Sequence, residues 1–215
     1  MGFGFRGRGT GGGTQHSDLG MIAELRAYWE ALRDGEMLPR RDRVDPRGIA
    51  GALEHSFLIE RIGTGLARFR IAGMAYNDLM GMDIRGMPIS SLFLGEARIR
   101  LQMELERLFR GPAILSMTLQ AERGLGRGAL SGRMVILPMI GQQGSSDLAI
   151  GCVELQGEIG RTPRRFGISD ARIEQIAAPA PTATKTAPAF AEETAVFVRA
   201  PRPQPGVPHL KLVKG

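Results

Sequence analysis

The chain has 215 residues, of which 43% are hydrophobic and 23% charged, proportions that suit one domain of ordinary size with its own core. The longest apolar run, residues 134–140, is far shorter than the roughly 20 residues of a membrane span, and the N-terminus lacks the apolar segment of a signal peptide. A single cysteine excludes an internal disulfide and fits a reducing compartment. We therefore expect a cytoplasmic protein without membrane contacts.

The net charge of +6 is concentrated at the two ends of the chain. Residues 1–17 are rich in glycine and predict a flexible leader, and residues 177–215 are rich in proline and alanine and predict a disordered tail. These two segments account for five of the six charges, so the predicted folded domain, residues 18–176, has a net charge of only +1. A folded nucleic-acid module usually concentrates basic charge on its own body. We therefore do not expect nucleic acid as the main partner, and non-specific binding through the basic tails remains the alternative function.

The first predicted element is an amphipathic helix that lies between Ser17 and Gly35. Its apolar residues Leu25, Trp29 and Leu32 recur at helical spacing. Because the tryptophan has a large apolar surface, this helix must pack against something. We expect that it covers the outer face of a sheet or meets a second copy of the chain, and we predict Leu25, Trp29 and Leu32 as the interaction surface.

A β-hairpin, a group of helices and three further strands follow in that order. The hairpin turns at Gly63-Thr64-Gly65, because two strand-like runs flank this short glycine turn. A longer helix with one apolar stripe ends at Gly111-Pro112. The three late strands are predicted at residues 113–122, 129–140 and 147–158. Several strand segments are apolar on both sides, so we expect layers on both faces of the sheet.

The side chains that acid–base catalysis would need do not converge in the sequence. His16 and His209 lie in the predicted flexible ends, and His55 lies just before the first strand. Glu104 and Glu106 are two positions apart on a helix and so point in different directions. No cysteine or histidine cluster has metal-ligand spacing, and no glycine-rich loop has the Lys-Ser/Thr continuation of a phosphate loop. We therefore predict that the chain is not an enzyme and binds no metal.

Six motifs occur in an order that resembles a known family. They are LRAYWEALRDGEMLPRRDRVDP at 25–46, LEHSFLIE at 53–60, RFRIAG at 68–73, LMGMDIRGMPISSLF at 79–93, GPAI at 111–114 and MVILPM at 134–139. Together they resemble a PAS domain over about residues 19–160, in particular a proteobacterial family of short proteins with one PAS domain and no output domain. The resemblance implies an α+β fold with a five-stranded antiparallel sheet and a helical insert on one face.

The resemblance also implies a small pocket, because the helices after the second strand of a PAS domain enclose a cavity against the sheet. The predicted lining residues are Phe69, Ile71, Asn77, Leu79, Met80, Met134, Ile136 and Cys152. The amide of Asn77 would bind neighbouring backbone or a ligand. These helices contain neither the reactive cysteine of flavin photosensors nor the axial histidine of haem sensors. We therefore predict no cofactor, and a small apolar ligand stays open.

From this resemblance we expect a non-catalytic sensory or regulatory module. Because the motifs include no kinase, cyclase or DNA-binding segment, its output would lie in another protein. We predict that it acts through protein–protein contacts with a signalling partner or in a homodimer, with a small ligand as one means of control.

Overall fold

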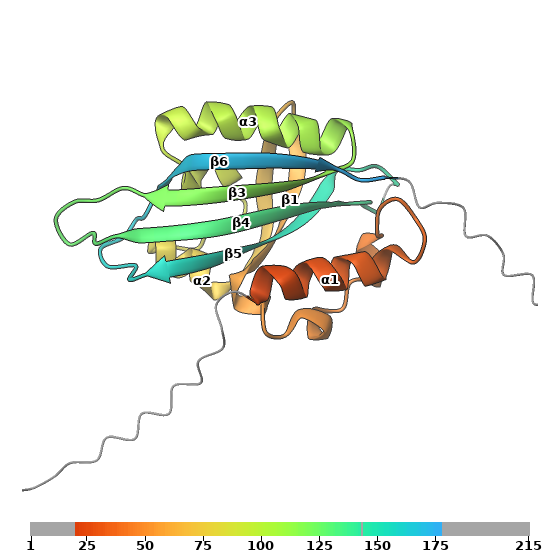
Figure 1. Ribbon diagram of the computed structural model, residues 1–215, viewed down its shortest axis with the longest axis horizontal. Helices are drawn as coiled ribbons and strands as arrows, with labels where there is room; N and C mark the ends of the chain where they lie inside the picture. The colour runs from red at the N-terminus through yellow and green to blue at the C-terminus, as the bar shows by residue number, and fades with distance from the viewer. Residues whose placement is uncertain (1–19, 143, 178–215) are drawn as a thin grey trace, which may run out of the picture. The chain divides into compact units, whose positions relative to one another are not determined.

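The computed structural model describes residues 20–142 and 144–177. Within these ranges the chain forms a six-stranded antiparallel sheet in the order β2-β1-β5-β4-β3-β6, with helices on both faces (Figure 1). This arrangement confirms the predicted α+β class. The predicted leader and nearly all of the predicted tail lie outside the described residues. No helix in the described ranges combines the length and the apolar character that crossing a membrane requires.

The elements follow the order that the sequence predicts, with one strand more at the end. The helices are α1 (Met21–Arg33), α2 (Met74–Met80) and α3 (Gly95–Arg110). The strands are β1 (Ser56–Gly63), β2 (Leu66–Ala72), β3 (Ala113–Ala121), β4 (Leu130–Met139), β5 (Leu148–Gly157) and β6 (Phe166–Gln175). Residues 34–55 join α1 to β1 through three short 3-10 turns, and we call this segment the connector.

The predicted hairpin turn is confirmed at Gly63-Thr64-Gly65. Gly65 has a φ of +64°, which favours glycine. A Cβ atom at this position would also lie 2.5 Å from the carbonyl oxygen of Gln102 on α3. The turn can therefore pack closely against α3 only because residue 65 has no side chain.

The inner face of the sheet packs against α2 and α3. Three aromatic rings, those of Phe57, Phe69 and Tyr76, form its centre, with ring centroids 5.4 to 6.0 Å apart. The Tyr76 hydroxyl donates a hydrogen bond to the carbonyl oxygen of His55 at 2.8 Å. Since side chains from β1, β2 and α2 interlock here, this cluster fixes the helical insert on the sheet.

The outer face of the sheet packs against α1 and the connector. Leu25 and Trp29 of α1 are almost fully buried in an apolar cluster with residues of β1, β4 and β5. The Trp29 indole Nε1 donates a hydrogen bond to the carbonyl oxygen of Pro138 at 2.9 Å. This carbonyl lies near the end of β4, beyond the last residue of that strand that pairs with β3. The prediction of layers on both faces is therefore confirmed.

The sixth strand, β6, was not predicted, and the five-stranded expectation is corrected here. It pairs with β3 along its length, from Phe166 opposite Ala121 to Gln175 opposite Ala113. Most of its residues are exposed or half-buried. An edge strand of this kind has no long apolar run, so its sequence alone resembles that of a polar loop. Only its pairing with β3 identifies it as a strand.

A buried arginine holds the chain just before β6. Arg164 is fully buried, and its guanidinium donates hydrogen bonds to the carbonyl oxygens of Glu122, Gly128, Glu158 and Ile159. These four acceptors come from the β3–β4 loop and from the segment after β5. Because the planar guanidinium has five fixed donors, one side chain can join both segments.

Candidate functional site

Five of the eight predicted pocket residues lie in the apolar cluster of the inner face. Phe69, Leu79, Met80, Met134 and Ile136 are all at most 6% exposed and pack against one another and against α3. Their location between the sheet and the helical insert is the one that the sequence predicts. Their side chains fill this space as a hydrophobic core.

Two of the other three predicted residues, Ile71 and Cys152, lie on the outer face, so the eight do not line one pocket. Ile71 is 51% exposed, and its side chain faces the outer side of the sheet. Cys152 is buried in the outer cluster, opposite Val135 of β4. Asn77 is half-buried on α2, and its side-chain oxygen has no hydrogen-bond partner among the described residues.

A β-bulge explains the misplacement of Ile71. Phe69 and Ile71 are two residues apart, and a regular strand would place both on one face. In the structure Phe69 pairs with Ile59 and Ile71 pairs with Leu58, so Arg70 is an extra residue in β2. An extra residue reverses the alternation of side chains along the strand. Ile71 therefore leaves the inner core and joins the outer face.

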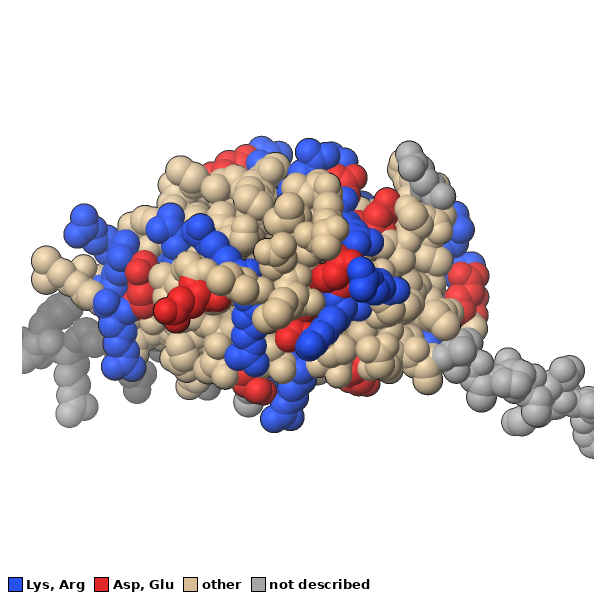
Figure 2. Space-filling view, turned by 90° about the horizontal axis from the view of Figure 1, so that it is seen from above, with Lys and Arg blue, Asp and Glu red and all other residues tan. Residues whose placement is uncertain are grey.

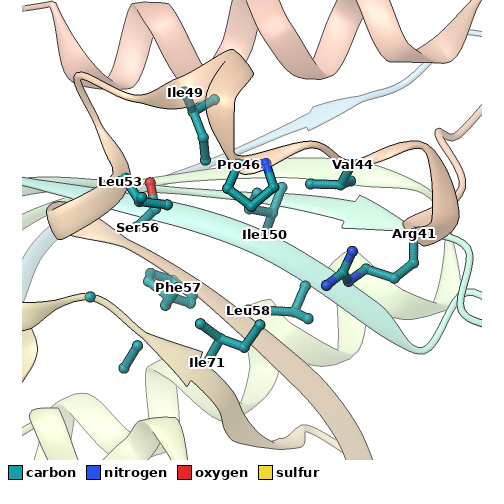
Figure 3. A pocket seen from close by; sticks show the side chains of 12 residues that line it. Arg41, Val44, Pro46, Ile49, Leu53, Ser56, Phe57, Leu58, Ile71 and Ile150 are labelled. Atoms are coloured by element: carbon teal, nitrogen blue, oxygen red, sulfur yellow. The ribbon is translucent and has the colours of Figure 1, made fainter.

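An apolar pocket of about 340 Å³ lies on this outer face, between the connector and the sheet (Figure 3). Its floor comes from three strands and its roof from the connector. The floor residues are Leu58 of β1, Ile71 of β2 and Ile150 of β5, and the roof residues are Val44, Pro46, Ile49 and Leu53. The volume is within the range of roughly 300–1,000 Å³ that is usual for small-molecule sites. This pocket is the candidate functional site.

Two polar side chains border the pocket, and only one has a partner. The Ser56 hydroxyl donates a hydrogen bond to the carbonyl oxygen of Ala52 at 2.8 Å. Arg41 stands at the other end, and its guanidinium points over Leu58 (Figure 3). The Arg41 side chain makes neither a hydrogen bond nor an ion pair within residues 20–142 and 144–177.

The roof of the pocket is hydrogen-bonded to α1 at two places. The Tyr28 hydroxyl donates to the carbonyl oxygen of Asp45 at 2.9 Å and accepts from the Asp45 backbone N–H at 2.7 Å. The Glu24 carboxylate accepts a hydrogen bond from the backbone N–H of Gly51 at 3.1 Å. Asp45 and Gly51 bracket two of the four roof residues, Pro46 and Ile49. The connector and α1 are therefore linked as one unit over the pocket.

The predicted interaction surface on α1 lies mostly inside the chain. Leu25 is fully buried, Trp29 is 1% exposed and Leu32 is half-buried. Leu25 and Trp29 pack on the outer face of the chain's own sheet, so a partner cannot reach them while α1 stays in place. This placement corrects the expectation that Leu25 and Trp29 are contact residues for a partner. The outward side of α1 instead presents Ala23 and Ala27.

Burial is the main cause of the pKa shifts of Cys152 in the outer core and of Tyr76 in the inner core. Burial raises the pKa of the Cys152 thiol to about 12, and the neighbouring Ser56 side chain offsets part of this effect. Burial also raises the pKa of Tyr76 well above its ordinary value. Both groups are therefore neutral at physiological pH, and Cys152 behaves as a small hydrophobic residue.

Charged side chains of both signs lie together on the surface that carries α3 (Figure 2). Glu106, for example, pairs with Arg61 at 2.9 Å and with Arg110 at 3.3 Å. Among the described residues, no group of three or more His, Cys, Asp or Glu side chains is placed to hold a metal ion. Nucleic-acid binding through the basic leader and tail concerns residues outside the described ranges and stays a prediction.

Comparison with known proteins agrees with the fold. A search of curated proteins finds no match. A family model described as a PAS domain, a class of sensory and regulatory modules that are typically non-catalytic, matches residues 19–154. The match runs from the start of α1 through most of β5 and thus includes the connector and the pocket. The chain therefore belongs to the PAS domain family.

Proposed function

We propose that this chain is a non-catalytic regulatory module in which a small ligand in the outer pocket controls the affinity of α1 for a partner protein. Membership of the PAS family supports the regulatory role. The observation that carries the proposal is the attachment of the pocket roof to α1 through Tyr28 and Glu24. We also propose that the module works in the cytoplasm, in keeping with its single buried cysteine.

A ligand can shift such a module only if it binds two positions of the connector with different affinity. The pocket residues Ile49, Leu58 and Ile150 belong to the same apolar cluster as Leu25 and Trp29. An occupant that moves the roof would therefore act on α1 through the two hydrogen-bonded attachments and through this shared packing. The coupling path is short, because Asp45 and Gly51 contact α1 directly.

The partner, a signalling protein or a second copy of the chain, would bind the outward side of α1. Ala23, Ala27 and Ala31 are exposed there, one helical turn apart. Their small side chains let another backbone approach α1 closely. This surface replaces the buried residues Leu25 and Trp29 as the proposed contact.

The test is partner capture with one substitution on this surface and a matched control. Ala27→Arg places a long charged side chain at the proposed contact, and Ala129→Arg makes the same change at an exposed residue of the β3–β4 loop. We expect that Ala27→Arg abolishes self-association in sedimentation velocity or the retention of a partner from the native cell. Ala129→Arg should preserve both. Equal behaviour of the two variants would show that α1 is not the output surface.

A further inference from the structure

The chemistry around Arg41 identifies the class of ligand that the outer pocket would take. Three arginines lie close together where the connector approaches the pocket, at positions 40, 41 and 43. Arg40 pairs with Asp42 at 3.5 Å, and Arg43 pairs with Asp34 at 3.8 Å and with Glu36 at 3.5 Å. Arg41 alone of the three has no carboxylate partner among the described residues, and it is the one that borders the pocket.

Two acidic residues share a hollow with Arg41 on its other side, and they differ in how they are paired. A second hollow that Arg41 borders also contains Glu60 and Asp147. Glu60 pairs with Arg68 at 3.0 Å and with Arg70 at 2.6 Å, and the hydrogen bond from Arg70 lowers the pKa of Glu60. The Asp147 carboxylate accepts a hydrogen bond from Ser145 at 2.8 Å through Oδ2, and its buried Oδ1 has no hydrogen-bond partner among the described residues.

The rest of the pocket selects for hydrocarbon. Among the residues that the structure describes, no acidic one lines it, and the hydroxyl of Ser56 donates to the carbonyl oxygen of Ala52. The walls therefore favour a ligand with an apolar body. The cation at the end of the pocket, Arg41, favours a ligand head group with one negative charge. A guanidinium binds a carboxylate through two parallel hydrogen bonds, which suits a single carboxylate better than a neutral polar group.

We propose that the outer pocket binds a monocarboxylate with an aliphatic chain, such as a medium-chain fatty acid, with its carboxylate on Arg41 and its chain between the connector and Ile150. The regulatory meaning of this binding rests on the proposed function, because the ligand would act by moving the roof and α1. The binding itself is a property of the isolated chain and is tested separately. The site lies on the opposite face of the sheet from the space under the helical insert.

Three probes with the same chain and different head groups test the charge requirement. Decanoate, decanol and decyltrimethylammonium are titrated into the full chain by calorimetry, below the concentrations at which they form micelles. One charge-assisted contact predicts about tenfold tighter binding of decanoate than of decanol. The cationic probe should bind most weakly, because its head group meets Arg41.

The role of Arg41 is tested with Arg41→Gln and a matched control from the same connector. Arg47 is exposed and does not line the pocket, so Arg47→Gln removes the same charge nearby. We expect that Arg41→Gln weakens decanoate about tenfold and leaves decanol unchanged. Arg47→Gln should leave both affinities unchanged.

The location of the aliphatic chain is tested with two equally exposed isoleucines. Ile71 and Ile62 are each 51% exposed, but only Ile71 lines the pocket. Ile71→Ala should weaken decanoate and decanol alike, by about fivefold, because it removes part of the apolar wall. Ile62→Ala should weaken neither. Since both side chains are half-exposed, both variants should fold.

Three results would overturn this inference: no saturable binding of decanoate, equal affinity for decanoate and decanol, or equal effects of Arg41→Gln and Arg47→Gln. None of them would remove the proposed function, because partner capture by α1 is measured without added ligand. The opposite outcome is also distinguishable. If the chain binds decanoate but Ala27→Arg and Ala129→Arg have the same effect on partner capture, the proposed ligand site stands and the proposed output surface on α1 is rejected.

Discussion

The two faces of the sheet differ in how they are covered, and we propose that this difference separates stability from regulation. On the inner face, Phe57, Phe69 and Tyr76 interlock with the helical insert and leave a filled core. On the outer face, α1 packs tightly through Trp29, but the connector spans an apolar pocket. A filled core has one well-packed arrangement, whereas a roof over a pocket can have an empty and an occupied one. We therefore expect the inner face to contribute most to stability, and we propose that control lies at the outer pocket.

The largest expected effect is a difference in the free energy of unfolding between substitutions at Phe69 and Ile71, two residues apart on β2. Phe69→Ala should lower the free energy of unfolding by about 4 kcal/mol, because it opens a cavity in a fully buried aromatic cluster. Ile71→Ala, on the other side of the bulge, should cost about 1 kcal/mol or less, because the side chain is half-exposed. Urea denaturation measures both. Similar losses would show that the bulge does not separate the two residues onto different faces.

Trp29→Phe should have the next largest effect and tests how firmly α1 is held. The substitution keeps most of the apolar packing but removes the hydrogen bond to the buried carbonyl oxygen of Pro138. We expect a loss of about 1.5 kcal/mol in the free energy of unfolding. Sedimentation should show unchanged self-association, because the residue is buried. A change in association without a change in stability would contradict the placement of Trp29 in the outer core.

Tyr28→Phe should lower the free energy of unfolding by about 1 kcal/mol, because it removes the hydroxyl that joins Tyr28 to Asp45. The same substitution should separate ligand binding from the effect of the ligand on α1. Calorimetry should show unchanged decanoate affinity, because Tyr28 does not line the pocket. The effect of decanoate on self-association or partner capture should decrease. If the response to decanoate were as large as in the wild type, the roof would act on α1 by another route.

The smallest expected effect is the pH dependence of stability that the Cys152 thiol causes. It tests whether water is excluded from the outer core. Burial raises its pKa to about 12 in the folded chain, whereas an unfolded cysteine titrates near 8.5. Above about pH 8.5 the unfolded chain therefore loses a proton that the folded chain keeps, so stability falls as the pH rises towards 12.

This pH effect is isolated by comparison with Cys152→Ala. Between pH 8 and pH 9 the wild type should lose about 0.7 kcal/mol more of its free energy of unfolding than the variant. Alkylation of the thiol at pH 8 should require unfolding. Rapid alkylation of the native chain would mean that the outer core opens readily around Cys152.

Much of the fold could be predicted because its signals are local. The glycine turn of the hairpin, the apolar stripe with Leu25 and Trp29, and the stop of α3 at Gly111 depend on residues close together in the sequence. The assignment of layers to both faces followed from strands that are apolar on both sides. Each of these features is present in the structure.

The candidate site could not be predicted to the same extent because it depends on contacts between distant segments. The bulge at Arg70 places Ile71 on the opposite face of the sheet from the one that a regular strand would give it. The residue type at position 70 does not predict a bulge. The pocket forms only when the connector lies over β1 and over β5, and β5 begins only at residue 148. Asp45 and Pro46 end one of the motifs that resemble the PAS family, but the contact of Asp45 with Tyr28 depends on the folded position of α1.

The most direct test of this account is a methyl NMR spectrum of the full chain with labelled isoleucines under xenon pressure, because xenon enters apolar cavities. Ile49, Ile71 and Ile150 line the outer pocket, whereas Ile59 and Ile136 are buried in the inner core. We predict saturable shifts at the three pocket residues and none at the two core residues. Shifts confined to Ile59 and Ile136 would place the binding cavity under the helical insert and contradict the account.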